Sequence, residues 1–186
     1  MIDISRALAI PGWMDPPDLT WLAESAAKAV RIVEIGSWKG RSTRALADHT
    51  AGVIYAVDPW GGPYLGAKNR PLKLRTAVRP SFELALRDHI RAGRVVALQA
   101  TSAAAAPQLF EQFGRTFDLA FIDGDHRGAS VLEDIALART LVRVGGVISG
   151  HDYNCPDWPE VGPAVREALG HEPDVVKYIW WTEVAA

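Results

Sequence analysis

The sequence has a single cysteine, Cys155, and no hydrophobic run of the roughly 18 residues that a membrane span requires. One thiol can form neither an internal disulfide nor a cysteine-based zinc cluster, which is typical of proteins from a reducing compartment. A secretory signal is also missing, because Pro11 and Gly12 interrupt the short apolar stretch at residues 7–10 and no basic segment precedes it. We therefore expect a cytoplasmic protein with no membrane partner.

Neither sign of charge is in excess, since 20 Lys and Arg face 22 Asp and Glu for a net charge of −2. Dedicated nucleic-acid-binding domains usually carry a strong basic excess, so we expect no nucleic-acid partner. A chain of 186 residues that is 48% hydrophobic can bury about 70% of its unfolded surface without disulfides or a structural metal. No repeat or linker divides it, so residues 1–186 are expected to form one domain, with residues 1–30 as an N-terminal helical cap.

Short apolar, β-branched runs alternate with longer amphipathic segments along the chain. The runs are too short for helices and apolar on both faces, which is typical of strands in a covered parallel sheet; they are residues 31–35, 53–57, 95–98, 119–122 and 146–149. The predicted helices are residues 17–29, 40–48, 82–91, 103–113, 129–142 and 163–169. Gly145 is the expected stop for the helix at 129–142, and residues 175–181 are left open as one strand or a tight pair. The alternation predicts an α/β fold.

Polar residues collect where the predicted strands end. In an open parallel sheet, ligands bind outside the carboxyl ends of the strands, so this edge is the expected site. The residues concerned, from the first strand end to the fifth, are Glu34, Gly36, Gly40, Asp58, Thr101, Ser102, Asp123, Asp125, His126, His151 and Asp152.

The first strand leads into a turn with glycines at Gly36 and Gly40, which allow a sharp bend and close approach of a ligand. Asp58 ends the second strand, the position from which a carboxylate can bind two ribose hydroxyls. The spacing is not that of a dinucleotide fingerprint, and Glu34 at the mouth favours a ligand with an ammonium group over one with pyrophosphate. Two alternatives stay open: Glu34 pairs with a neighbouring arginine at the surface, or Asp58 only opens a turn with Pro59.

Residues 33–43, together with Asp58, resemble motif I and its acidic partner in class I S-adenosylmethionine-dependent methyltransferases. Residues 117–126 and 145–152 are similar to the small-molecule O-methyltransferase branch that includes catechol and macrolide-sugar O-methyltransferases. The resemblance implies a Rossmann-like three-layer sandwich whose mostly parallel seven-stranded sheet has an antiparallel last strand. It also implies S-adenosyl-L-methionine as cofactor and a small-molecule acceptor as substrate, while a homo-oligomer is left open.

Carried over position by position, the resemblance gives roles to individual residues. Gly36 and Gly40 would line the methionine part of the cofactor, Glu34 would help to hold its amino group, and Asp58 would bind the ribose. Thr101 and Ser102 would lie near the adenine. The full set of cofactor-binding residues implied is Glu34, Gly36, Ser37, Gly40, Ser42, Asp58, Thr101, Ser102 and Asp123.

Asp123 and Asp152 match the two metal-binding aspartates of the catechol-type enzymes, which implies Mg²⁺ or Mn²⁺. Magnesium often uses one or two carboxylates with several waters. Tyr153 stands where those enzymes have an asparagine, so this sequence departs from the pattern at the position of the third protein ligand. His126 occupies the slot of their lysine base, and histidine can accept a proton near neutral pH; His151 is the competing base. The alternative is that both aspartates only cap the turns that follow them.

Three other functions are compared with a methyltransferase. A metal-dependent phosphoester hydrolase would need more ligands than residues 124–126 and 150–152 offer. A nicotinamide-dependent oxidoreductase is disfavoured by the glycine spacing of the first turn. A non-catalytic module that binds S-adenosylmethionine stays open because of Tyr153. The acceptor is not identified, although the basic segment at residues 68–79 is a candidate lid over an anionic substrate.

Overall fold

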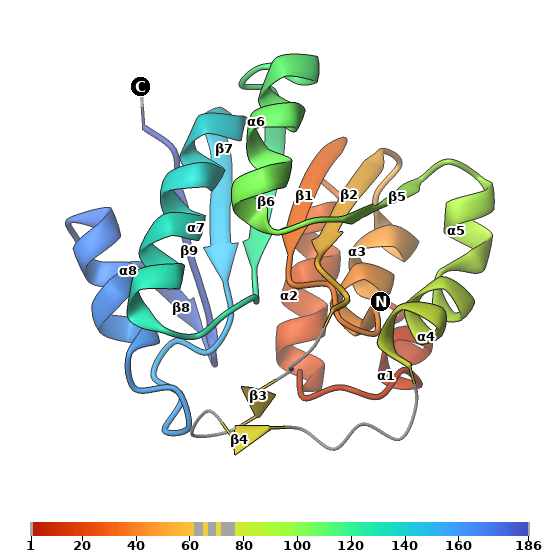
Figure 1. Ribbon diagram of the computed structural model, residues 1–186, viewed down its shortest axis with the longest axis horizontal. Coiled ribbons are helices and arrows are strands. Elements are labelled where there is room, and N and C mark those ends of the chain that lie inside the picture. Colours follow the sequence, from red (N-terminus) through yellow and green to blue (C-terminus); the bar gives the residue numbers. More distant parts are fainter. Residues whose placement is uncertain (1, 62–64, 67–69, 72–76, 186) are drawn as a thin grey trace.

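A seven-stranded sheet forms the centre of the computed structural model, which describes residues 2–61, 65–66, 70–71 and 77–185 (Figure 1). The strands lie in the order β5 (Val95–Gln99), β2 (Val53–Asp58), β1 (Arg31–Ile35), β6 (Phe117–Ile122), β7 (Val142–Gly150), β9 (Ile179–Glu183) and β8 (Asp174–Val176). The first five are mutually parallel, and β9 runs antiparallel to both of its neighbours. This confirms the predicted sheet, including its antiparallel last strand.

Helices cover both faces of this sheet (Figure 1). One face carries α6 (Ser102–Phe113), α7 (Gly128–Leu141) and α8 (Val161–Leu169). The other carries α1 (Ser5–Leu8), α2 (Pro16–Ala26), α3 (Arg41–His49), α4 (Val78–Ala85) and α5 (Arg87–Arg91). Two short strands, β3 (Leu65–Gly66) and β4 (Arg70–Pro71), pair with each other outside the main sheet. No helix in the described ranges is long and apolar enough to cross a membrane.

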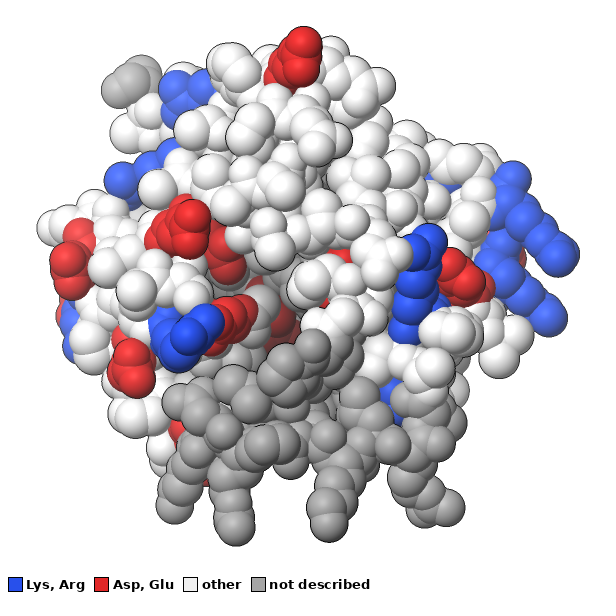
Figure 2. Space-filling model, viewed as in Figure 1, with Lys and Arg blue, Asp and Glu red and all other residues white. Residues whose placement is uncertain are grey.

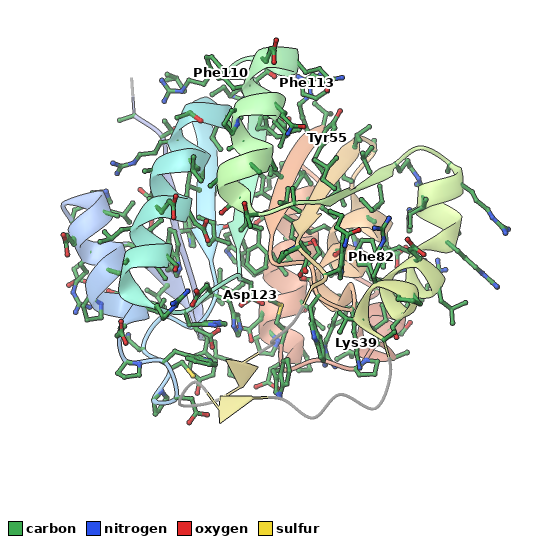
Figure 3. The ribbon with its side chains drawn as sticks, viewed as in Figure 1. Lys39, Tyr55, Phe82, Phe110, Phe113 and Asp123 are labelled. Carbon is green, nitrogen blue, oxygen red and sulfur yellow. The ribbon has the colours of Figure 1, made fainter. Side chains whose placement is uncertain are left out.

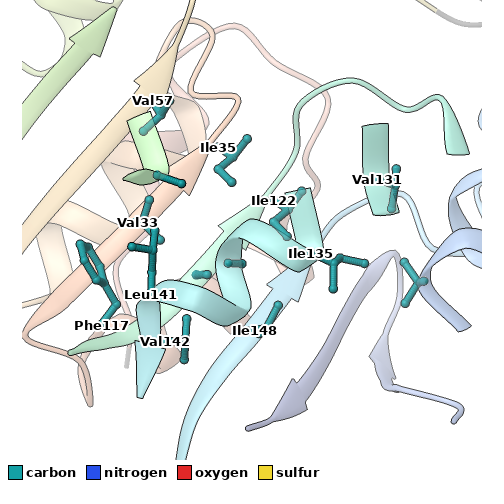
Figure 4. Close-up of a cluster of buried hydrophobic side chains, with 14 of the residues drawn as sticks. Val33, Ile35, Val57, Phe117, Ile122, Val131, Ile135, Leu141, Val142 and Ile148 are labelled. Atoms are coloured by element: carbon teal, nitrogen blue, oxygen red, sulfur yellow. The ribbon is translucent and has the colours of Figure 1, made fainter. Parts of the chain in front are cut away.

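Two hydrophobic clusters, one on each face, hold the three layers together. Successive residues of β1 point to opposite faces, so Ile32 packs beneath α2 and α3 while Val33 and Ile35 pack beneath α6 and α7. Figure 4 shows the cluster beneath α6 and α7, where Val33 and Ile35 lie in the same layer as Ile135 of α7. Burial on both faces explains why the strands read as nearly continuous apolar runs rather than as alternating ones.

The structure corrects two predicted boundaries and resolves one ambiguity. The helix predicted at 82–91 is two helices, because the backbone leaves helical geometry at Leu86 (φ −107°, ψ 8°). Gly145 does not stop a helix: α7 ends at Leu141, and β7 begins at once with the buried Val142, which pairs with Phe117. Residues 174–183 form a tight antiparallel pair of strands. Most of the basic segment at 68–79 lies outside the described residues.

Candidate active site

The predicted site residues meet at the carboxyl ends of the parallel strands. Figure 3 shows Asp123 at this end of β6, whereas Tyr55, Phe110 and Phe113 lie toward the opposite end of the sheet. On the face of the molecule seen in Figure 2, several acidic side chains lie beside a hollow. A cavity at the same end is lined by Asp123, His126 and His151 on its polar side and by apolar residues, Ile122, Val131, Val161 and Trp180.

The first turn, residues 36–40, requires its two glycines. Gly36 and Gly40 have φ values of +89° and +88°, a left-handed conformation that side chains disfavour. A Cβ atom on Gly36 would also lie 2.1 Å from the backbone oxygen of Asp123. The first turn therefore lies directly against the end of β6, and the two segments form one continuous wall.

Glu34 lies beneath the first turn and has no exposed surface. Its Oε2 accepts hydrogen bonds from the hydroxyls of Ser37 (2.6 Å) and Thr43 (2.5 Å), so its partners are hydroxyl groups and not an arginine. Burial raises the pKa of Glu34 to about 7, although hydrogen bonds from Ser37, Ser42 and Thr43 oppose the increase. Oε1 has no hydrogen-bond partner among the described residues. Thr43 belongs to this buried network but is absent from the predicted set.

Asp58 holds the first turn in place from the neighbouring strand. Its Oδ2 accepts the backbone N–H of Trp38 (2.8 Å), and its Oδ1 accepts that of Trp60 (2.6 Å). The Trp60 indole in turn donates to the backbone oxygen of Trp38 at 2.9 Å. Asp58 therefore opens a turn, as the alternative supposed, and it also supports the loop that would surround a cofactor.

Thr101 and Ser102 begin α6. The Thr101 side chain caps the helix by accepting the N–H of Ala104 at 3.3 Å. Ser102 hydrogen-bonds to the carboxylate of Asp134, a residue of α7 whose pKa burial raises to about 6. The Asp134 carboxylate also packs against Gly124, where a Cβ would lie 3.3 Å from its Oδ2. Asp134 thus connects the predicted adenine side of the site to the turn after β6, and sequence reasoning missed it.

Asp123, His126 and Asp152 form what we call the Asp–His cluster. Nε2 of His126 lies 2.7 Å from Oδ2 of Asp152 and 3.5 Å from Oδ1 of Asp123. One ligand atom from each residue falls within 4.8 Å of the others. Two carboxylates and one imidazole suit a divalent ion such as Mn²⁺, and the carboxylates alone suit Mg²⁺. The ring of His126 stacks on Trp158 with 4.2 Å between ring centroids, which fixes its orientation.

His151 lies behind the Asp–His cluster and is almost fully buried. Its Nδ1 lies 3.3 Å from Oδ2 of Asp152, and its Nε2 lies 3.4 Å from Oδ2 of Asp18 in α2. Asp18 is also absent from the predicted set. The only signal in the sequence is its place three residues after Asp15, where a helix cap already accounts for it.

The charges of the cluster are strongly coupled. Burial alone would lower the pKa of both histidines, but the carboxylates outweigh it: Asp123 and Asp152 raise the pKa of His126 to about 9, and Asp152 and Asp18 raise that of His151 to about 10. Burial likewise opposes the charge of Asp152, yet the two imidazoles hold the pKa of this carboxyl well below its usual range. The Asp152 carboxyl is therefore ionised, and a cation bound beside it would compete with the protons of the two imidazoles.

Tyr153 takes no part in the Asp–His cluster. Its hydroxyl donates to Oε2 of Glu172 at 2.7 Å and accepts from Arg166 at 3.1 Å. The departure from the catechol-type pattern thus places a structural residue after Asp152, and His126 is the third group beside the two aspartates.

Several solved structures with a similar fold are methyltransferases. CalS11, a calicheamicin methyltransferase, is 16% identical with a TM-score of 0.70, covering 89% of this chain and 76% of its own. The O-methyltransferase TomG from Streptomyces achromogenes is 19% identical with a TM-score of 0.68, covering 100% and 87%. An O-methyltransferase from Bacillus cereus is 20% identical with a TM-score of 0.62, covering 88% and 72%. These likenesses show the fold, and no curated protein sequence matches the chain.

The family is shown by sequence. The profile of the methyltransferase domain matches residues 33–153, a span that runs from β1 through the first turn and the Asp–His cluster to Tyr153. The chain belongs to this methyltransferase family. The resemblance stated from residues 33–43, 117–126 and 145–152 is thereby confirmed.

Proposed function

We propose that this protein transfers a methyl group from S-adenosyl-L-methionine to a hydroxyl oxygen of a small molecule. The observation that carries the proposal is the meeting of two structures at one rim: the first turn with Asp58, and the Asp–His cluster. The solved relatives agree with the proposal. TomG was solved with S-adenosylmethionine, and the Bacillus cereus enzyme was solved with SAH, the form of this cofactor that has lost its methyl group. CalS11 is described as a TDP-rhamnose 3′-O-methyltransferase.

The first turn and its neighbours are the proposed cofactor site. S-adenosylmethionine supplies an electrophilic methyl group, and the protein must hold an acceptor oxygen close to and in line with it. Asp58 would accept hydrogen bonds from the ribose, and Thr101 and Ser102 would lie beside the adenine. Gly36 and Gly40 allow the backbone to approach the methionine part, and Glu34 with Ser37 and Ser42 supports the first turn from beneath and would help to hold the amino group.

Asp123 and Asp152 are the proposed metal ligands, with His126 beside them. A divalent cation there would supply positive charge that polarises the acceptor hydroxyl and lowers the pKa of a neighbouring imidazole. Of the two histidines, His126 is the proposed base, because its side chain is 21% exposed and stacks on Trp158 at the rim, whereas that of His151 is 7% exposed. The imidazole of His126 would accept the proton of the acceptor hydroxyl in its neutral form. The two aspartates hold its pKa at about 9, which the charge of a bound cation would lower. Both nitrogens of His151 face carboxylates, which suits a supporting role.

Calorimetric titration with S-adenosylmethionine tests this function, with NAD as the control ligand and with Mg²⁺, Mn²⁺ or chelator present. We expect micromolar binding of S-adenosylmethionine and none of NAD. Failure of the folded protein to bind S-adenosylmethionine would contradict the proposal. Binding without methyl transfer to any of a broad panel of hydroxylated acceptors would favour a non-catalytic module.

The Asp58→Ala variant tests the cofactor site itself. Loss of hydrogen bonds from two ribose hydroxyls to a charged group should weaken S-adenosylmethionine binding roughly 10- to 100-fold. Asp118→Ala is the matched control, because Asp118 also accepts two backbone N–H groups, those of Val30 and Arg31, but stands at the opposite end of the sheet. Equal affinities in the two variants would show that Asp58 only shapes a turn.

A further inference from the structure

Asp18 belongs to α2, near the N-terminus, yet it reaches the Asp–His cluster. It is 1% exposed, and its Oδ2 lies 3.4 Å from Nε2 of His151, a residue 133 positions away in the chain. The opposite ring nitrogen of His151 lies 3.3 Å from Oδ2 of Asp152. That same oxygen lies 2.7 Å from Nε2 of His126. A continuous line of carboxylates and imidazoles therefore runs from α2 to the rim.

Helix capping does not account for this placement. Asp18 and Asp15 form the two halves of a capping box at the start of α2, and Oδ2 of Asp18 accepts the backbone N–H of Asp15 at 3.2 Å. A capping side chain can do this at the surface, as Asp15 does with a half-exposed side chain. Asp18 is instead buried, and its Oδ1 has no hydrogen-bond partner among the described residues. Burying a carboxylate in this way is costly unless another interaction stabilises it.

Asp152 needs support from its surroundings. Its backbone has φ +62°, a left-handed conformation that aspartate adopts less readily than glycine. Its Oδ2 is the atom that faces both imidazoles. An imidazole held between two carboxylates has one preferred ring orientation, so Asp18 limits how His151 can turn and His151 limits where the Asp152 oxygen can lie.

We propose that Asp18 is a positioning residue of the candidate metal site, acting through His151 on the carboxylate of Asp152. The inference rests on the metal site of the proposed function. It makes α2 a part of that site, in addition to its packing against α3 and the sheet. Removal of a residue that supports a metal ligand through hydrogen bonds typically changes the metal affinity 10- to 100-fold.

Titration with Mn²⁺, followed by the electron paramagnetic resonance of the free ion, tests this. Asp18→Ala should weaken Mn²⁺ binding about tenfold or more. Asp18→Asn keeps the size of the side chain and an oxygen acceptor, so it should recover part of the affinity. The matched control is Asp15→Ala, which removes the other half of the same capping box without touching His151. It should lower the melting temperature about as much and leave the Mn²⁺ affinity within about twofold of the wild type.

A second comparison places the effect on His151. In a His151→Ala background, Asp18→Ala should cause no further loss of Mn²⁺ affinity, since the residue through which it acts is gone. Equal Mn²⁺ affinities in Asp18→Ala and Asp15→Ala, in proteins that fold, would overturn the inference while leaving the metal site intact. If the wild type binds no Mn²⁺, or if Asp123→Asn binds it as well as the wild type, the metal site itself is wrong and the inference falls with it.

Discussion

At the scale of a single residue, Glu34 is a carboxyl group with no exposed surface beneath the first turn, where burial disfavours its ionised form. Its pKa is raised from 4.5 to about 7, chiefly by burial. The folded state therefore binds the proton of Glu34 more tightly than the unfolded state does. This contribution to the stability of the folded protein is complete below pH 4.5 and is lost as the pH rises to 7. At 1.36 kcal/mol per unit the loss is about 3 kcal/mol.

Glu34→Gln should remove this pH dependence. The free energy of unfolding of Glu34→Gln, relative to that of the wild type, should rise by about 3 kcal/mol between pH 4.5 and pH 7 and then level off. Urea denaturation at pH 4.5, 5.5, 6.5 and 7.5 without ligand measures this. Glu111→Gln, at an exposed position of α6, is the control and should show no such rise. A difference that stays constant with pH would mean that Glu34 has the same pKa in the folded and the unfolded protein.

The first turn and the end of β6 behave as one element, because Gly36 leaves no room between them. Gly36→Ala adds an atom that would lie 2.1 Å from the Asp123 oxygen, in a backbone conformation that already disfavours a side chain. Gly93→Ala is the matched control: Gly93 has φ +70° but open space around its added atom. We expect Gly93→Ala to cost about 1 kcal/mol of stability from backbone strain alone.

Gly36→Ala should cost clearly more than this and should also weaken S-adenosylmethionine binding at least tenfold, since the first turn must move away from Asp123. Chemical denaturation and calorimetry measure the two effects. The same affinity in both glycine variants would show that the packing of the first turn against β6 does not shape the cofactor site.

Local pattern explains which elements could be predicted. The five parallel strands were predictable because both of their faces are covered, which leaves apolar, β-branched runs in the sequence. The break at Leu86 was not, because no proline or glycine marks it. The rim residues Asp58, Asp123 and Asp152 could be located from strand ends alone. The contact of Asp18 with His151 could not, because it joins residues 133 positions apart and a helix cap already explained Asp18 locally.

At the scale of the whole molecule, an ion network centred on the buried Arg44 connects helices α1, α3 and α5 on one face of the sheet. Arg44 of α3 has a side chain that is 3% exposed, and it binds Asp48 through Nε at 2.8 Å and Asp88 of α5 through Nη1 at 2.8 Å. Arg6 of α1 reaches the same Asp88 at 2.7 Å. Nη1 of Arg44 also donates to the backbone oxygen of Ala85 at the end of α4. One guanidinium thus joins segments that are far apart in the sequence.

Arg44→Ala should lower the free energy of unfolding by about 2 kcal/mol, because Asp48, whose side chain is 15% exposed, would lose the hydrogen bond from a buried cation. Asp88 contributes less, since its side chain is 42% exposed and it keeps its ion pair with Arg6. Urea denaturation followed by tryptophan fluorescence and by circular dichroism should give this value in a single coincident transition. Glu83→Gln is the control, since it removes an exposed ion pair with Arg79 within α4 and should change stability by less than about 0.5 kcal/mol. Should Arg44→Ala cost no more than that control, the packing of α1, α3 and α5 against the sheet must hold them without the network, and hydrophobic burial alone would account for the covered face.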